Sequence, residues 1–348
     1  MEEKTSIIIQ QEEYAAVDIF KLICACLVIL IHTKPFENNF LLDSAIGMFT
    51  RFAVPYFFTI SGYFLFCKID ATILEDRGRI VRTYLFRLIR FYVIWFVILR
   101  SFDYILSGQK YTVRYYIKQF FFTTDGSALW FVEALIWATI IVVFLDRVIN
   151  RITIFIIGIG CLLIGYCFST LLGITGGWQL IGLLKPVFDF IGVQGGILFA
   201  FPYVAMGALL AKYPTVPRLK RDILLTGVFF WCLGIESIIM VIKLQAPLTF
   251  IWLSAVPMIW FTTRTTLTVV IKDKPVYYMF RKISTLCFVL HVPIYKLLQI
   301  WFRSTNIYEF DTMNLILTGL TMTTTILVAL CLLILSKKRQ FYLLRYLI

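Results

Sequence analysis

Long apolar runs constrain the fold of this chain more than any other feature. Runs of about eighteen or more mostly apolar residues recur along nearly its whole length, and an α-helix needs a run of this length to cross a bilayer. A transmembrane β-barrel would show alternating segments of about ten residues instead. The composition agrees, since 60% of the residues are hydrophobic and only 15% are charged, against about 25% charged in soluble domains. The sequence therefore predicts an all-α integral membrane protein.

The apolar runs divide the chain into about ten predicted transmembrane helices within a single domain over residues 1–348. These predicted spans are 16–35, 46–67, 86–106, 128–146, 152–173, 192–211, 223–243, 248–266, 284–302 and 314–335. Residues 1–15 are acidic and polar, without the basic start of a secretory signal, and we expect them to be a cytoplasmic segment. Residues 336–348 are expected to be a basic cytoplasmic tail.

Basic residues set the predicted orientation. Most of the 33 Lys and Arg residues cluster in the segments between alternate spans, which is the positive-inside pattern of bilayer proteins. Both termini are therefore predicted to be cytoplasmic, and the formal charge of +13 does not indicate a nucleic-acid partner. On the outer side, residues 107–127 and 174–190 either roof a cavity or lie among the lipid headgroups.

The cysteines do not indicate a metal site or a disulfide framework. The chain has eight, almost all within apolar spans, and none belongs to a CxxC motif or a Cys/His cluster. Small, weakly polar thiols in such positions are typical of packing residues. We expect no bound metal.

Three ionisable residues occupy the first predicted helix. Lys21 follows Asp18 by three positions and precedes His32 by eleven. Eleven steps of about 100° return to within about 20° of the start, so the three side chains share one stripe, with His32 about 16 Å beyond Lys21. We expect Asp18 and Lys21 to neutralise each other near the cytoplasmic mouth. Alternatively they are only a helix-end ion pair from which Lys21 extends to water.

Both histidines of the chain fall within predicted spans. An imidazole transfers protons near neutral pH, which favours a general-base or relay role for His32 over a buried structural role. His291 precedes Pro293 by two residues, and this proline should kink its helix and open backbone carbonyls to a cavity. The alternative for His291 is a hydrogen bond between helices.

Other polar residues of the spans are candidates for binding. Arg87 and Arg90 share a helix face and can clamp a phosphate-rich ligand, or else anchor the helix at the cytoplasmic surface. Glu133 is a lone acid that must be protonated or lie beside a cation. Ser61 and Gly62 are small residues that favour close packing of helices.

An ordered set of motifs resembles a known family. The chain has no GxSxG, Walker, HExxH or dinucleotide motif. It does contain, in this order, Asp18-Ile-Phe-Lys21 and His32, VPYFFTISGYFLF at 54–66, Arg87-Leu-Ile-Arg90-Phe-Tyr92, LWFVEAL at 129–135, and Leu290-His291-Val292-Pro293. This set is similar to that of the acyltransferase-3 family of bacterial integral membrane proteins, which transfer acyl groups to extracytoplasmic sugars and other acceptors.

The resemblance implies a multi-pass enzyme of the bacterial plasma membrane. It implies that His32 is catalytic with Asp18 and Lys21 in support, and that cytoplasmic acyl-CoA, such as acetyl-CoA, is a co-substrate without a tightly bound cofactor. It also implies that Arg87 and Arg90 contact the acyl donor. Further candidate substrate-binding residues are Tyr92, Glu133, His291 and Ser61. Many members have Arg where this chain has Lys21, so the charge is kept and the planar fork is lost. The acceptor is a small molecule or a glycan, and a homodimer is left open.

A second resemblance gives a different function. The segment DIFKLICACLVILIHTKPF, followed by VPYFFTISGYFLF, is similar in sequence to the membrane domain of vancomycin-resistance serine racemases. In those proteins the membrane domain precedes a pyridoxal-phosphate racemase domain and is thought to bring in L-serine. This chain would then be a serine transport module with a fused or partner racemase domain, and no racemase chemistry would lie in these residues.

Overall fold

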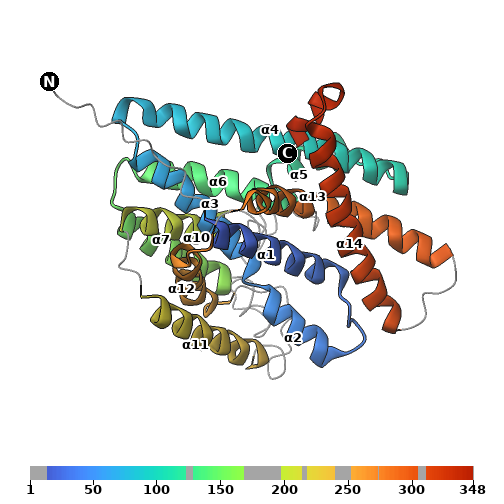
Figure 1. The fold of residues 1–348 in the computed structure, drawn as a ribbon, viewed down its shortest axis with the longest axis horizontal. Coiled ribbons are helices and arrows are strands. Elements are labelled where there is room, and N and C mark those ends of the chain that lie inside the picture. Colours follow the sequence, from blue (N-terminus) through green and yellow to red (C-terminus); the bar gives the residue numbers. More distant parts are fainter. Residues whose placement is uncertain are drawn as a thin grey trace.

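The computed structural model describes residues 14–122, 128–167, 197–213, 218–239, 252–272, 274–304 and 311–347. Within these ranges the chain is all-helical, with twelve α-helices and one 3₁₀ helix (Figure 1). The helices are α1 (Ala15–Thr33), α2 (Phe40–Thr50), α3 (Ala53–Asp70), α4 (Leu74–Ser107), α5 (Val113–Phe121), α6 (Trp130–Leu145), α7 (Arg151–Tyr166), α10 (Ile197–Lys212), α11 (Leu219–Ile238), α12 (Ala255–Thr268), α13 (Pro275–Ser304), α14 (Asp311–Ser336) and the 3₁₀ helix η3 (Arg339–Leu347).

The predicted fold class is confirmed, and each predicted span overlaps a described helix. Among the described residues, four stretches are long and apolar enough to cross a membrane, namely Ala15–Thr33, Phe40–Asp70, Pro275–Ser304 and Met313–Ser336. They indicate an integral membrane protein. The count of ten spans, the single domain and the cytoplasmic ends stay predictions. Residues 1–13 and 174–190 lie outside the described residues.

Helix α1 lies at the middle of the bundle (Figure 1). It packs against α13 and also contacts α14, α2, α3 and α12. The helix ends at Thr33 because Lys34 adopts a left-handed conformation, with φ of 44°, and Pro35 follows it. Proline disfavours a helical conformation in the residue before it. After this stop the chain turns through residues 34–39 into α2, which contacts α1.

Helices α3 and α10 approach each other at two glycines. A methyl group at position 207 would overlap the backbone of Thr59 and Tyr63, and one at Gly62 would overlap the carbonyl of Val204. The expected packing role of Gly62 is therefore confirmed. Close backbone approach through small residues is how membrane helices gain contact area when lipid gives no hydrophobic drive.

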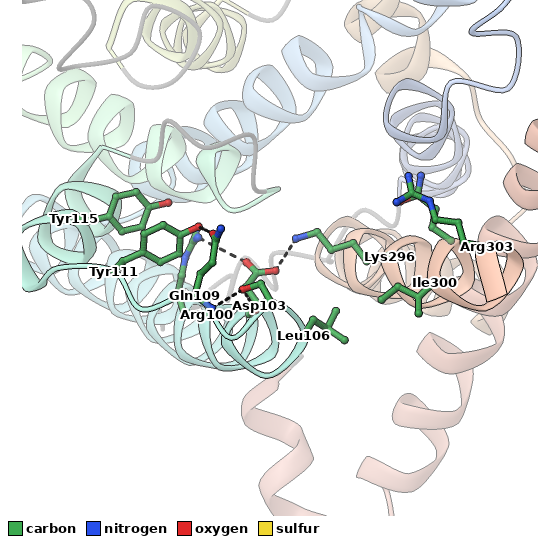
Figure 2. A pocket seen from close by; sticks show the side chains of 11 residues that line it. Arg100, Asp103, Leu106, Gln109, Tyr111, Tyr115, Lys296, Ile300 and Arg303 are labelled. Carbon is green, nitrogen blue, oxygen red and sulfur yellow. Dashed lines mark hydrogen bonds and ion pairs between the residues drawn. The ribbon is translucent and has the colours of Figure 1, made fainter.

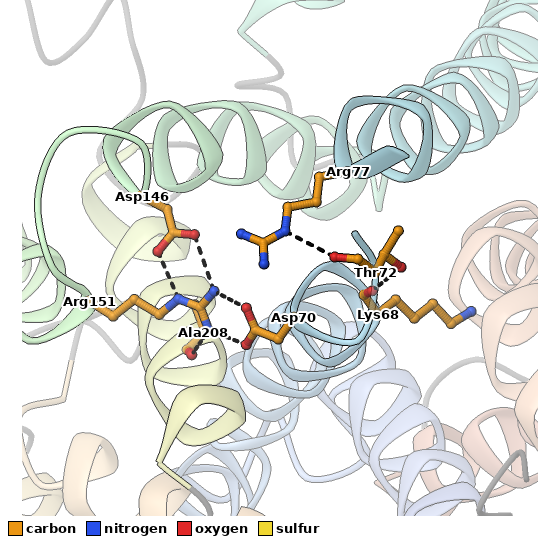
Figure 3. Close-up of polar contacts among 7 residues, drawn as sticks. All are labelled: Lys68, Asp70, Thr72, Arg77, Asp146, Arg151 and Ala208. Atoms are coloured by element: carbon orange, nitrogen blue, oxygen red, sulfur yellow. Dashed lines mark hydrogen bonds and ion pairs between the residues drawn. The ribbon is translucent and has the colours of Figure 1, made fainter. Parts of the chain in front are cut away.

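A buried arginine joins the ends of four helices (Figure 3). Arg151, at the start of α7, donates through Nε and Nη2 to Asp146 at 2.7 and 3.1 Å, and through Nη1 and Nη2 to Asp70 at 2.7 and 2.6 Å. Its Nη1 also donates to the carbonyl of Ala208 on α10 at 3.0 Å. These contacts use all five donors of the guanidinium. The side chain is only 4% exposed, so its charge is neutralised almost entirely inside the protein.

The hairpin of α11 and α12 is fastened at both ends. Near the start of α11, Asp222 accepts from Nε of Arg264 on α12 at 2.9 Å. At the other end, the carboxylate of Glu236 accepts from the backbone N–H groups of Leu253 and Ser254 at 2.9 and 2.8 Å. A carboxylate at a helix N-terminus satisfies donors that have no partner within the helix. The two helices are thereby held in a fixed register.

Replacing Gly207 with Ala should destabilise the protein. Overpacking costs about 1–3 kcal/mol, whereas Gly→Ala in an open helix position stabilises by about 0.5–1 kcal/mol. Gly160 on α7 has no neighbour within 4 Å of an added Cβ, so Gly160→Ala is the matched control. Thermal unfolding in detergent should therefore give shifts of opposite sign, and equal shifts would contradict this packing.

Removing the guanidinium of Arg151 should lower the stability of the protein more than Gly207→Ala does. Arg151→Leu leaves two carboxylates facing each other without a cation, and breaking a buried charge pair in this way costs about 3–5 kcal/mol. Arg147→Leu is the control, because Arg147 is exposed only four residues away. Adding Asp70→Asn and Asp146→Asn to Arg151→Leu should recover part of the lost unfolding temperature. If this triple variant unfolds at a still lower temperature than Arg151→Leu alone, the charge explanation is refuted.

Candidate functional site

The two histidines meet between α1 and α13. The ring centroids of His32 and His291 are 4.9 Å apart, with an angle of 47° between the ring planes. His291 is fully buried, whereas His32 is half-buried. The chain separates these residues by more than two hundred positions, so the pairing is a product of the α1–α13 contact. It joins the two residues that the sequence singles out for proton transfer.

The hydrogen bonds of His291 indicate its tautomer. Its Nδ1 lies 2.8 Å from the carbonyl oxygen of Cys287, one turn earlier on α13. Because a carbonyl only accepts, Nδ1 carries the proton and Nε2 carries the lone pair. Nε2 is buried and has no hydrogen-bond partner among the described residues. The lone pair is thus available to a proton donor at the histidine pair.

Asp18 binds an arginine on α13, which corrects the expected ion pair with Lys21. Nε and Nη2 of Arg281 donate to the two carboxylate oxygens of Asp18 at 2.9 Å each. The carboxylate is 5% exposed and the guanidinium 39%. Arg281 lies far away in the sequence, and its planar fork matches a carboxylate better than an ammonium does. Within the described residues, Asp18 and Lys21 form no ion pair of 4 Å or less.

Lys21 instead lies among other cations. Its Nζ is 5.4 Å from the centre of the Phe64 ring on α3. It is close enough to Asp18, Arg281 and Arg87 for each to act on its charge. The predicted entrance therefore combines three basic groups from three helices with one carboxylate. Such a cluster attracts an anion such as a phosphate.

Arg87 and Arg90 both lie against aromatic rings. Arg87 is exposed and its guanidinium is 5.6 Å from the ring of Tyr84, while the guanidinium of Arg90 is 5.1 Å from that of Tyr346 in η3. Nε of Arg90 has no hydrogen-bond partner in the described part of the chain. Neither arginine is used up in an ion pair among these residues, in contrast to Arg151.

The remaining candidates lie in packed positions. Tyr92 is buried and donates from its hydroxyl to the carbonyl of Phe120 at 2.7 Å, which fastens α5 to α4. Ser61 is half-buried on α3, close to Tyr84. Glu133 is buried in the first turn of α6. Pro293 lies within a continuous α13, so the predicted kink stays a prediction.

Two arginines of this region were not singled out from the sequence. Arg281 is one of several basic residues at the start of a span, and nothing in its spacing marks it as the partner of Asp18. Arg51, between α2 and α3, is close enough to act on the charge of His32. The sequence does not distinguish Arg51 as a site residue either, because a basic residue next to an apolar run is common in membrane proteins.

Metal ligands do not gather in this region. Among the described residues, no group of three or more His, Cys, Asp and Glu side chains could hold a metal ion. All eight cysteines are free.

Comparison with known proteins decides the family. A family model described as an acyltransferase domain matches residues 14–335. The chain belongs to this acyltransferase family. The match covers all the helices that carry the stripe, the arginines and the histidine pair, and the resemblance seen in the sequence is confirmed.

This acyltransferase-family protein also has a named relative. An amino-acid racemase of Enterococcus faecalis is 28% identical over 225 residues, which is 62% of this chain and 31% of the relative. The chain therefore spans about a third of the racemase it matches. No solved structure matches the chain.

A double-mutant cycle should assign the partner of Asp18. Asp18→Asn with Arg281→Gln should show a coupling of about 1 kcal/mol in unfolding free energy, at the lower end for contacting charges because Arg281 is partly exposed. The same cycle with Lys21→Gln in place of Arg281→Gln is the control, and its coupling should be smaller. A larger coupling to Lys21 would restore the pair expected from the sequence.

Proposed function

We propose that this protein is a membrane acyltransferase that moves an acyl group from cytoplasmic acyl-CoA to an acceptor at or beyond the outer face. The observation that carries the proposal is the contact between His32 and His291, with ring centroids 4.9 Å apart in the middle of an acyltransferase-family domain. An imidazole with an available nitrogen is a suitable general base near neutral pH.

The donor would enter at the opposite end of α1. Lys21, Arg87 and Arg281 gather there around the single carboxylate of Asp18, and Arg90 follows Arg87 on the same helix. Phosphate groups suit such cations, and arginine binds them in a bidentate manner. From the level of Lys21 the acyl arm would extend about 16 Å along α1 to reach His32.

The chemistry would then follow from the histidine pair. His32 takes the proton of an acceptor hydroxyl or amine while that atom attacks the thioester carbonyl. When the tetrahedral intermediate collapses, the C–S bond breaks and the imidazolium returns the proton to the leaving thiolate. Arg51, which acts on the charge of His32, is suited to stabilise the oxyanion. His291 would orient His32 through its Nε2. Alternatively, His32 itself accepts the acyl group transiently.

The similarity to an amino-acid racemase supports a second candidate. In that case the same helices bring L-serine across the bacterial plasma membrane for a fused or partner racemase domain. Polar and proline-containing helices are compatible with a transport path. This function needs no acyl donor, which separates the two candidates experimentally.

Purified protein should hydrolyse or transfer acetyl-CoA, and His32→Ala should lower the rate by about 10²–10⁴-fold, the usual contribution of a general base. Arg87→Gln and Arg90→Gln should instead raise KM for acetyl-CoA, because they remove contacts to phosphate and leave the base in place. The readout is release of free CoA thiol together with the acylated product.

Cys331→Ser is the matched control, since Cys331 is exposed on α14 away from the histidine pair. Turnover that His32→Ala leaves unchanged would overturn the mechanism. Proteoliposomes that take up serine saturably, without acyl-CoA and without CoA release, would favour the transport candidate instead.

A further inference from the structure

A polar pocket lies between the carboxy-terminal halves of α4 and α13, beside α5 (Figure 2). Its volume is about 380 Å³. The residues that matter for its chemistry are Arg100, Asp103, Tyr111, Tyr115, Lys296 and Arg303. The pocket is separate from the proposed acyl-transfer site. Lys296 follows His291 by five residues, which places it about 140° around α13 from the histidine.

The charges of the pocket favour an anion. Three basic side chains and one carboxylate give a formal net charge of +2. Figure 2 shows Asp103 between two of the cations, with Nζ of Lys296 at 2.6 Å and Nη1 of Arg100 at 3.8 Å. Asp103 therefore already neutralises the ammonium group of Lys296, as an anion supplied by the protein itself. A ligand with several acceptor oxygens can compete for Lys296 and contact the two arginines as well.

The surroundings of the pocket are those of a membrane interface. The orientation predicted from the basic residues places it at the outer end of α4 and α13. Ile105 and Trp301 are exposed beside it, by 78% and 57%. The rings of Tyr111 and Tyr115 stack along its edge with their centroids 4.2 Å apart. Tyrosine and tryptophan are enriched where a bilayer meets water. The pocket thus combines cations with aromatic residues at the depth of lipid headgroups.

We propose that this pocket binds a phosphate-bearing ligand, with Arg100, Lys296 and Arg303 as donors and Asp103 as a competing internal anion. The phosphate belongs either to an anionic phospholipid headgroup or to a soluble phosphate ester. Phosphate is preferred to a carboxylate because it presents more acceptor oxygens to cations that approach from two helices. A zwitterion fits less well, since its ammonium group would have to displace Lys296 from Asp103.

The ion pair of Asp103 with Lys296 allows a test in which two substitutions should change ligand affinity in opposite directions. Lys296→Gln removes a donor and should weaken binding by about tenfold, the worth of one charge-assisted hydrogen bond. Asp103→Asn removes the competing anion and should strengthen binding. Both variants break the same 2.6 Å ion pair, so a purely structural role predicts parallel effects. Lys296→Arg is the charge-conserving control. Because it keeps a cation at this position, its affinity for the ligand should stay within about threefold of that of the native protein, which would show that loss of binding in Lys296→Gln is not caused by misfolding.

The full chain would be tested with two probes. Phosphatidylglycerol in phosphatidylcholine nanodiscs is measured by native mass spectrometry, and glycerol 1-phosphate by its effect on thermal unfolding in detergent. Lys110→Gln is the matched control, because Lys110 is an exposed lysine close to the pocket in the chain but not in its lining.

Binding of either probe, with opposite effects of Lys296→Gln and Asp103→Asn, supports the proposal. Preference for phosphatidylglycerol assigns a lipid, and preference for glycerol 1-phosphate assigns a soluble ester. The proposal is overturned if neither probe binds, if the two variants shift binding in the same direction, or if Lys110→Gln weakens it as much as Lys296→Gln. None of these outcomes depends on acetyl-CoA turnover.

Discussion

Charge buried within an apolar bundle has to be neutralised by the protein itself, because lipid offers no partner. Arg151 meets this constraint with all five of its donors bound to Asp70, Asp146 and Ala208. Its four helix ends also include those of α3 and α10, the pair that packs through glycines. The position of the rest of the bundle around α3 depends on this junction.

The same constraint is met in two other places, and all three lie on one side of the protein. Asp222 with Arg264 and Asp18 with Arg281 join helix ends that the sequence predicts to be cytoplasmic, as Asp70 and Asp146 with Arg151 do. In the described residues, the predicted outer side is held by the more exposed ion pair of Asp103 with Lys296 and by the carboxylate of Glu236 at the start of α12. The more deeply buried ion pairs between helices thus gather at one end of the bundle. The histidine pair and the polar pocket lie farther along the same helices, away from these buried ion pairs.

This arrangement separates basic residues that the sequence makes look alike. Arg151, Arg264 and Arg281 are bound to carboxylates and hold helices together. Lys21, Arg87 and Arg90 lie against aromatic rings instead, so their charges can act on a ligand. Cations that hold helices together and cations that can act on a ligand therefore lie at the same end of the protein, and Arg281, which binds Asp18 close to Lys21 and Arg87, belongs to both groups.

The sequence by itself determined the all-helical membrane fold, since the length of the apolar runs leaves no other way to satisfy the backbone in lipid. It also marked Asp18, His32 and His291 as unusual, and its ordered motifs indicated the family. Only the tertiary structure decided which residues meet. Local spacing put Lys21 next to Asp18, but the α1–α13 contact gives that carboxylate to Arg281, 263 residues away, and places His32 against His291. Such partners depend on how helices cross, and helix periodicity fixes the face of a residue but not the helix that covers it.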